Sequence, residues 1–97
     1  MRIFTKRTIQ EGWQKYPDAE GQLQAWYYEA KNADWKTPAD IKQKYGNASL
    51  LADNRVVFNI CGNKYRLIVK IAYRAGLVYV RFFGTHKEYD KINAEEI

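Results

Sequence analysis

A few residues in the last third of the chain could together carry out chemistry on a phosphodiester. His86 is the single histidine among the 97 residues, and histidine is the side chain best suited to exchanging protons near neutral pH. Arg66 and Arg81 carry planar guanidinium groups that match phosphate oxygens. Lys87 and Tyr89 flank the histidine and could supply charge, a stacking ring or a second proton carrier. These residue types suit metal-independent RNA cleavage, which needs proton transfer and positive charge at the phosphate.

Each of these residues also has a structural interpretation. A lone histidine is often an incidental surface residue, and Arg66 and Arg81 could simply be solvated side chains of a sheet. Lys87 could be an ordinary surface lysine, and Tyr89 could pack a short helix on the sheet. The spacing Thr85-x-x-Glu88 is a capping box, which predicts a short helix from His86 and a structural task for Glu88.

Strands and helices must bring these distant residues together. Polar and apolar residues alternate with period two over 55–60, 64–73 and 77–84, and the turns between these runs are short enough to require antiparallel hairpins. Before residue 55 the spacing is helical, with one helix after Thr5, a second after Pro17-Asp18 and a short one after Thr37-Pro38. Residues 1–4 could add a short strand. We therefore expect one α+β domain over residues 1–97, with N-terminal helices packed on an antiparallel β-meander and a short C-terminal helix.

The turn at Gly62-Asn63 predicts the register of the first hairpin, with Asn59 opposite Arg66 and Arg55 opposite Lys70. If the next hairpin pairs Tyr73 with Val78, Lys70 lies opposite Arg81 and Val69 opposite Phe82. One face is then apolar and needs the helices as cover. The other face carries cations and no carboxylate, which favours an RNA-binding surface over a merely solvated one. The residues predicted to bind RNA on it are Arg55, Asn59, Lys64, Lys70 and Tyr79.

Composition narrows the classes of function. The chain has 16 Lys+Arg against 11 Asp+Glu, a net charge of +5 that is concentrated in residues 55–97, which favours a polyanionic partner. One cysteine excludes an internal disulfide and, with one histidine, a Cys/His zinc cluster. We expect no metal or organic cofactor. The start of the chain lacks the apolar core of a signal peptide, so we expect a cytoplasmic location.

Two segments, in this order, resemble the HigB toxins of the RelE/ParE superfamily of bacterial type II toxin–antitoxin systems. They are Phe58-Asn59-x-x-Gly62-Asn63-x-x-Arg66 and the run from Thr85 to Asp90, Thr-His-Lys-Glu-Tyr-Asp. The resemblance implies a RelE-like fold and an mRNA interferase, a metal-independent endoribonuclease that cuts mRNA on the ribosome. It also implies a HigA-type helix-turn-helix antitoxin, through which the toxin would contact operator DNA indirectly. Among the site residues, the resemblance extends to Arg66, Arg81 and His86 first, and then to Asn59, Lys64, Lys87 and Tyr89.

A different class of function fits the same charge pattern. The chain could be a non-enzymatic RNA- or ribosome-binding module, or a ParE-like toxin that inhibits gyrase. His86 discriminates between these hypotheses, because a pure binder needs no titratable group within a basic surface. Which residue would be the general base and which the general acid stays open.

Overall fold

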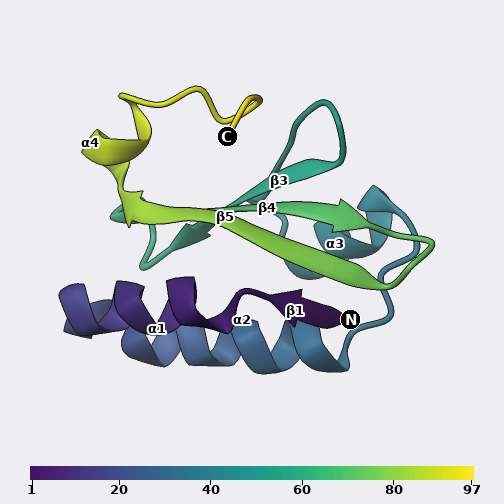
Figure 1. Cartoon of the computed structure of the whole chain (residues 1–97), viewed down its shortest axis with the longest axis horizontal. Helices are drawn as coiled ribbons and strands as arrows, with labels where there is room; N and C mark the ends of the chain where they lie inside the picture. Colours follow the sequence, from purple (N-terminus) through teal and green to yellow (C-terminus); the bar gives the residue numbers. More distant parts are fainter.

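The chain folds into three layers around a mixed five-stranded sheet (Figure 1). The structure is a computed structural model that describes residues 1–97. One layer holds the helices α1 (Lys6–Lys15) and α2 (Glu20–Asn32), joined by a 3-10 turn at Pro17–Ala19. The sheet contains β1 (Arg2–Phe4), β2 (Ser49–Leu50), β3 (Arg55–Ile60), β4 (Tyr65–Ala72) and β5 (Leu77–Thr85), in the spatial order β1-β5-β4-β3-β2. α3 (Pro38–Lys44) precedes β2, and α4 (His86–Tyr89) follows β5.

The predicted α+β architecture is confirmed, including each helix. Apolar residues of α1 and α2 lie at helical spacing and are buried against the sheet, among them Ile9, Leu23 and Trp26. α3 begins directly after Thr37, as predicted, and a capping box holds its start: the Thr37 side chain accepts from the Asp40 N–H and the Asp40 carboxylate accepts from the Thr37 N–H. None of the helices has the length and the apolar character that a membrane-spanning segment requires.

The hairpin of β3 and β4 has the predicted register. Asn59 lies opposite Arg66 and Arg55 opposite Lys70. Gly62 in the turn has a φ of +66°, a conformation that glycine adopts without the steric cost of a side chain. The expected strand at the N-terminus is β1, which runs parallel to β5. β2 was not predicted, because two residues are too few to show a period.

The hairpin of β4 and β5 differs from the prediction. The terminal pairs are Ala72 with Leu77 and Ile71 with Val78, so Val78 pairs two residues earlier on β4 than predicted and Lys70 lies opposite Tyr79. A β-bulge follows: Val69 pairs with Val80 and Ile68 with Phe82, which leaves Arg81 as the extra residue on β5. The predicted pairs of Lys70 with Arg81 and of Val69 with Phe82 are therefore wrong. Period-two alternation contains no signal for an inserted residue.

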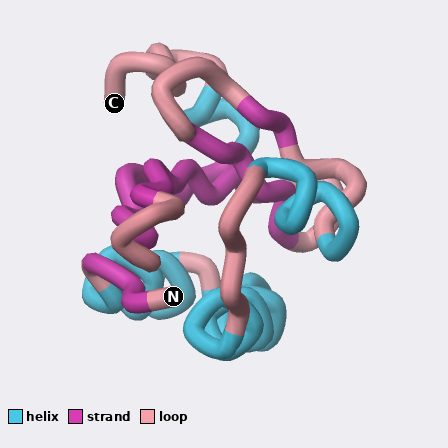
Figure 2. The backbone as a smooth tube through the Cα atoms, turned by 90° about the vertical axis from the view of Figure 1, so that its right-hand side faces the viewer, coloured by secondary structure: helices cyan, strands magenta, loops and turns pink.

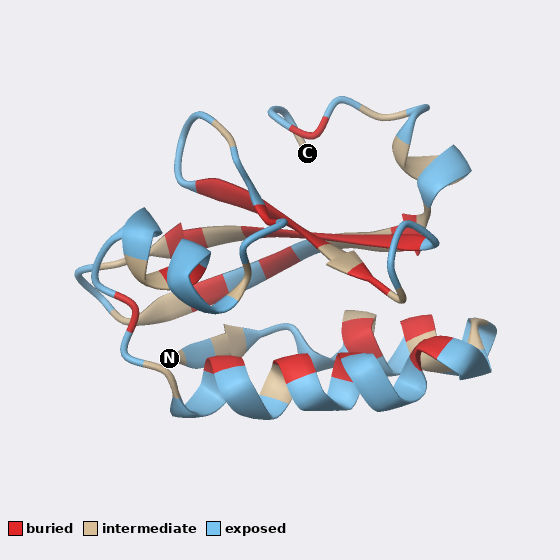
Figure 3. Ribbon diagram, turned by 180° about the vertical axis from the view of Figure 1, so that it is seen from behind, coloured by how far each residue is buried: buried red, intermediate tan, exposed pale blue.

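The C-terminal segment, residues 91–97, covers part of the sheet face opposite α1 and α2 (Figures 1 and 2). Buried residues therefore lie on both sides of the sheet, as Figure 3 shows. On this second face Val57, Ile68 and Ala94 form a small apolar cluster, and Phe82, Tyr89, Ile92 and Ile97 pack against it. The bulge contributes directly, because it turns Phe82 toward this cluster and Phe83 toward the helices. The second face is thus not the fully open surface that we predicted.

Candidate active site

A network of hydrogen bonds holds α4 at the end of β5. Glu88 N–H donates to Thr85 Oγ1 at 3.1 Å, and Thr85 N–H donates to Glu88 Oε1 at 2.9 Å, which confirms the predicted capping box. Tyr16 from the helical layer donates its hydroxyl to the same carboxylate oxygen at 2.7 Å. The Thr85 N–H and then the Tyr16 hydroxyl hold the pKa of Glu88 below its usual value. Glu88 therefore has a structural role, and the side chains of His86 and Lys87 are left exposed.

Arg66 lies beside α4 with its charge unpaired. The residue is only 9% exposed, and its Nη1 donates to the backbone carbonyls of Asn63 and Tyr65, each at 3.1 Å. Its guanidinium carbon is 5.9 Å from the centroid of the Tyr89 ring. No carboxylate lies within ion-pairing distance of it. A guanidinium that is fixed in place but not neutralised is suited to binding an anion.

His86 is oriented by a neighbouring carboxylate. Its Nδ1 lies 3.0 Å from Asp90 Oδ2, one helical turn away, and its ring centroid is 6.5 Å from that of Tyr89. A proton on Nδ1 would be donated to Asp90, leaving Nε2 as the nitrogen available to a substrate. The backbone N–H of His86 donates to the Lys64 carbonyl at 3.0 Å, which ties α4 to the turn between β3 and β4.

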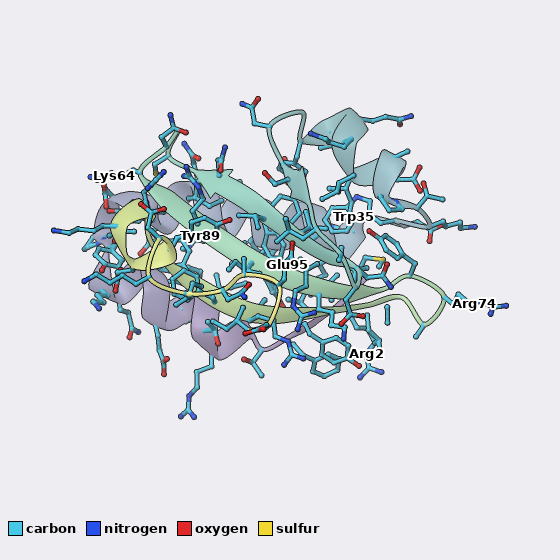
Figure 4. The ribbon with its side chains drawn as sticks, turned by 90° about the horizontal axis from the view of Figure 1, so that it is seen from above. Arg2, Trp35, Lys64, Arg74, Tyr89 and Glu95 are labelled. Atoms are coloured by element: carbon cyan, nitrogen blue, oxygen red, sulfur yellow. The ribbon has the colours of Figure 1, made fainter.

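These contacts bring together part of the predicted set. Arg66 and His86 both lie beside Tyr89, and Figure 4 shows Tyr89 on the sheet face that the C-terminal segment also occupies. Asp90 was not among the predicted site residues, although its i, i+4 spacing from His86 is a signal that could have found it. The site thus combines an unpaired guanidinium, an oriented imidazole and an aromatic ring within one corner of the molecule.

Comparison with known protein families identifies the family of the chain. Residues 19–92 match the family model of HigB toxin, described as the RelE-like toxic component of a toxin–antitoxin system. The chain belongs to the HigB toxin family. A member of such a system has an antitoxin as its partner.

Curated HigB proteins align with nearly all of this family member. The mRNA interferase toxin HigB of Escherichia coli strain K12 is 27% identical over 96 residues, which are 97% of this chain and 92% of that protein. The mRNA interferase HigB of Shigella flexneri has the same identity and coverage. The mRNA interferase HigB of Escherichia coli O6:H1 is 28% identical over 94 residues, 95% of this chain and 91% of that protein.

Two predicted RNA-binding cations of this HigB family member, Arg55 and Lys70, have carboxylate partners. Arg55 is 7% exposed, and Asp53 Oδ2 accepts from Arg55 Nη1 at 2.8 Å and from Lys70 Nζ at 2.9 Å. These hydrogen bonds, that of Lys70 first, lower the pKa of Asp53. Arg55 also donates from Nε and Nη2 to the Ile97 carbonyl, at 3.1 and 2.9 Å. The prediction of a sheet face without carboxylates is therefore wrong, since sequence alternation does not show what a preceding loop contributes.

The remaining predicted residues are spread around the sheet. Lys64 is paired with Asp18, whose other oxygen accepts from the Tyr65 hydroxyl at 2.5 Å, and the hydrogen bond with Asp18 raises the pKa of Lys64. Asn59 is half-buried opposite Arg66. Arg81 is exposed at the bulge, and Tyr79 is exposed next to Lys70. The structure thus clusters Arg66, His86 and Tyr89, while Arg81 lies farther along β5.

Proposed function

We propose that this HigB family member is an mRNA endoribonuclease that cuts mRNA on the ribosome, in the cytoplasm, by metal-independent acid–base catalysis. The observation that supports this most directly is the unpaired guanidinium of Arg66 beside an imidazole that Asp90 orients. The aligned HigB proteins are named mRNA interferases, which supports the same substrate class. The proposed antitoxin is a HigA-type helix-turn-helix protein.

In the proposed reaction the 2′-hydroxyl of one nucleotide loses a proton and attacks the adjacent phosphorus. The bond from phosphorus to the 5′-oxygen breaks, and that oxygen takes up a proton, so the products are a 2′,3′-cyclic phosphate and a 5′-hydroxyl. His86 Nε2 would exchange one of these protons, and Tyr89 would carry the other or stack on a base. Arg66 would stabilise the charge on the cleaved phosphate, supported by Lys87, and Arg81, farther along β5, would bind another phosphate of the same strand.

Four residues are proposed to bind RNA rather than to act in the chemistry. Asn59 lies opposite Arg66 across the sheet and Lys64 precedes Arg66 by two residues, and both would hold the RNA near the cleaved bond. Lys70 and Tyr79 are paired across β4 and β5 on the same face. Arg55 is not proposed to bind RNA, because its guanidinium is buried against Ile97 and Asp53.

Mapping of mRNA 5′ ends after induced expression tests the proposal. The wild type should create new 5′-hydroxyl ends in translated messages. His86→Ala should reduce cleavage by roughly 10²- to 10⁴-fold, the usual contribution of acid–base catalysis. Arg7→Gln, a change at an exposed α1 arginine paired only with Glu11, is the matched control for Arg66→Gln and Arg81→Gln. Melting curves of all variants show whether each one folds.

Three outcomes would overturn the proposal. Equal cleavage by the wild type, His86→Ala and Arg66→Gln would reject this site. Growth arrest without new mRNA ends would instead support a non-enzymatic binder, and DNA damage in its place would indicate a ParE-like gyrase inhibitor.

A further inference from the structure

Two exposed aromatic rings lie side by side on the second face of the sheet, outside the candidate active site. Phe4 on β1 and Tyr79 on β5 are register partners, their ring centroids are 6.0 Å apart, and their planes differ by 24°. Phe4 is 38% exposed and Tyr79 is 36% exposed. Their chain neighbours Ile3 and Val78 point the other way and pack in the main core, so the strand pattern forces both rings outward.

Cations surround these rings. The Arg2 guanidinium carbon lies 5.5 Å from the Phe4 ring centroid, within cation–π range. Arg81 follows Tyr79 by two residues on β5, and neither Arg2 nor Arg81 takes part in an ion pair. Lys70 is the partner of Tyr79 on β4, but Asp53 already neutralises it. We call Arg2, Phe4, Tyr79 and Arg81 the aromatic platform.

The aromatic platform is separate from the α4 site but lies on the same side of the molecule. Figure 4 views this side and shows Arg2 well away from Tyr89, with Glu95 of the C-terminal segment between them. Tyr79 and Thr85 are six residues apart on β5, and the strand rise of about 3.3 Å per residue puts them ~20 Å apart. A single RNA strand engaged at α4 could therefore reach the platform only with nucleotides distant from the cleaved bond.

We propose that the aromatic platform binds an unpaired base and its phosphate in an RNA strand whose cleaved bond lies at α4. This inference rests on the proposed function. Bases stack on exposed aromatic side chains regardless of their identity, and unpaired arginines bind the adjoining phosphates. RNA is favoured over a protein partner because the surface offers two free cations around little apolar area, whereas protein interfaces have a larger apolar centre.

Crosslinking with a non-cleavable RNA tests the platform. The probe is a 12-nucleotide RNA with 2′-O-methyl groups throughout, which removes the attacking hydroxyl, and with one photoreactive 5-iodouridine at varied positions. The wild-type full chain should crosslink to Tyr79 or Phe4 from positions several nucleotides away from those that crosslink to α4. The variant Phe4→Thr/Tyr79→Thr should lose these crosslinks and bind the 12-mer roughly tenfold or more weakly.

Matched variants distinguish a loss of binding at the platform from the effect of a changed net charge and from misfolding. Tyr28→Gln alters another exposed aromatic, 60% exposed on α2, and should leave RNA affinity unchanged. Arg2→Gln should weaken binding and reduce its dependence on salt concentration.

The results would also distinguish this inference from the proposed function. Equal 12-mer affinity for the wild type and the folded double variant would overturn the platform while leaving cleavage at α4 intact. Loss of antitoxin binding with unchanged RNA binding would overturn it as well and would assign the surface to a protein partner. RNA crosslinks at Tyr79 in a chain that cuts no mRNA would support the platform and reject the proposed function.

Discussion

The buried Arg55 provides a direct test of how the C-terminal segment is held on the sheet. Its guanidinium donates two hydrogen bonds to the Ile97 carbonyl and one to Asp53, and the residue is 7% exposed. A hydrogen bond to a charged group contributes about 1.5–3 kcal/mol. Arg55→Met retains an apolar stem but removes both bonds to Ile97. Because the freed carbonyl can regain water when the segment detaches, we expect a cost of about 2–3 kcal/mol rather than the full sum.

Hydrogen exchange measures this cost at the segment itself. The amides of Glu96 and Ile97 donate to the Asn93 carbonyl, so they should exchange about 30- to 150-fold faster in Arg55→Met, given tenfold per 1.4 kcal/mol. Amides in the middle of β4 should be unaffected. Lys70→Met is the matched control, since it removes the other partner of Asp53 without touching Ile97. Equal exchange of residues 91–97 in the two variants would refute the anchoring role of Arg55.

Two further predictions concern the packing of the helical layer and the stability of the protein at low pH. A Cβ at Gly12 in α1 would lie 2.5 Å from Phe83 Cδ2, so Gly12→Ala should lower the free energy of unfolding by about 1–3 kcal/mol in urea titrations. The control is Gly21→Ala in α2, where a Cβ would meet open space, and it should raise the free energy of unfolding by about 0.5–1 kcal/mol. A similar effect of both changes would contradict the packing argument. The fold lowers the pKa of Asp18, Asp40, Asp53 and Glu88, so their stabilisation is present above the unfolded pKa values and is lost as these carboxylates become protonated. The melting temperature should therefore be similar from pH 7 to about 5 and should fall below about pH 4. A constant melting temperature down to about pH 3 would contradict this assignment.

The parts of the fold that the sequence predicts correctly are those determined by local signals. Gly62 and Asn63 allow one short turn between two alternating runs, and this set the register of β3 and β4 without any tertiary information. The spacing of Thr85 and Glu88 likewise indicated where α4 begins. These signals were sufficient to place Arg66 and His86 near the same end of the sheet.

The parts that were missed depend on contacts between distant residues. No local signal shows that Arg81 is an extra residue, because Val80, Phe82 and Phe83 are all suited to a strand. The bulge instead goes with the packing of Phe82 on one side of the sheet and of Phe83 on the other. The pairing of Asp53 with Arg55 and Lys70 depends on two positive-φ residues, Asp53 and Asn54, which turn the loop back beside β3. The position of residues 91–97 over the second face could not be predicted from local signals either, since that segment is neither a helix nor a strand.

These differences change where positive charge is available on the sheet. In the predicted arrangement Arg55, Lys70 and Arg81 form one row, and each like-charged pair would cost roughly 0.2–1 kcal/mol. In the structure the register of β4 and β5 places Tyr79 instead of Arg81 opposite Lys70, while Asp53 neutralises the two cations that remain in the row. The middle of the face is thus occupied by Arg55 and the segment it anchors. Unpaired arginines remain at Arg66 beside α4, at Arg81 on the bulge and at Arg2 beside Phe4. An RNA strand on this face would therefore be held at separate places rather than along a continuous basic row.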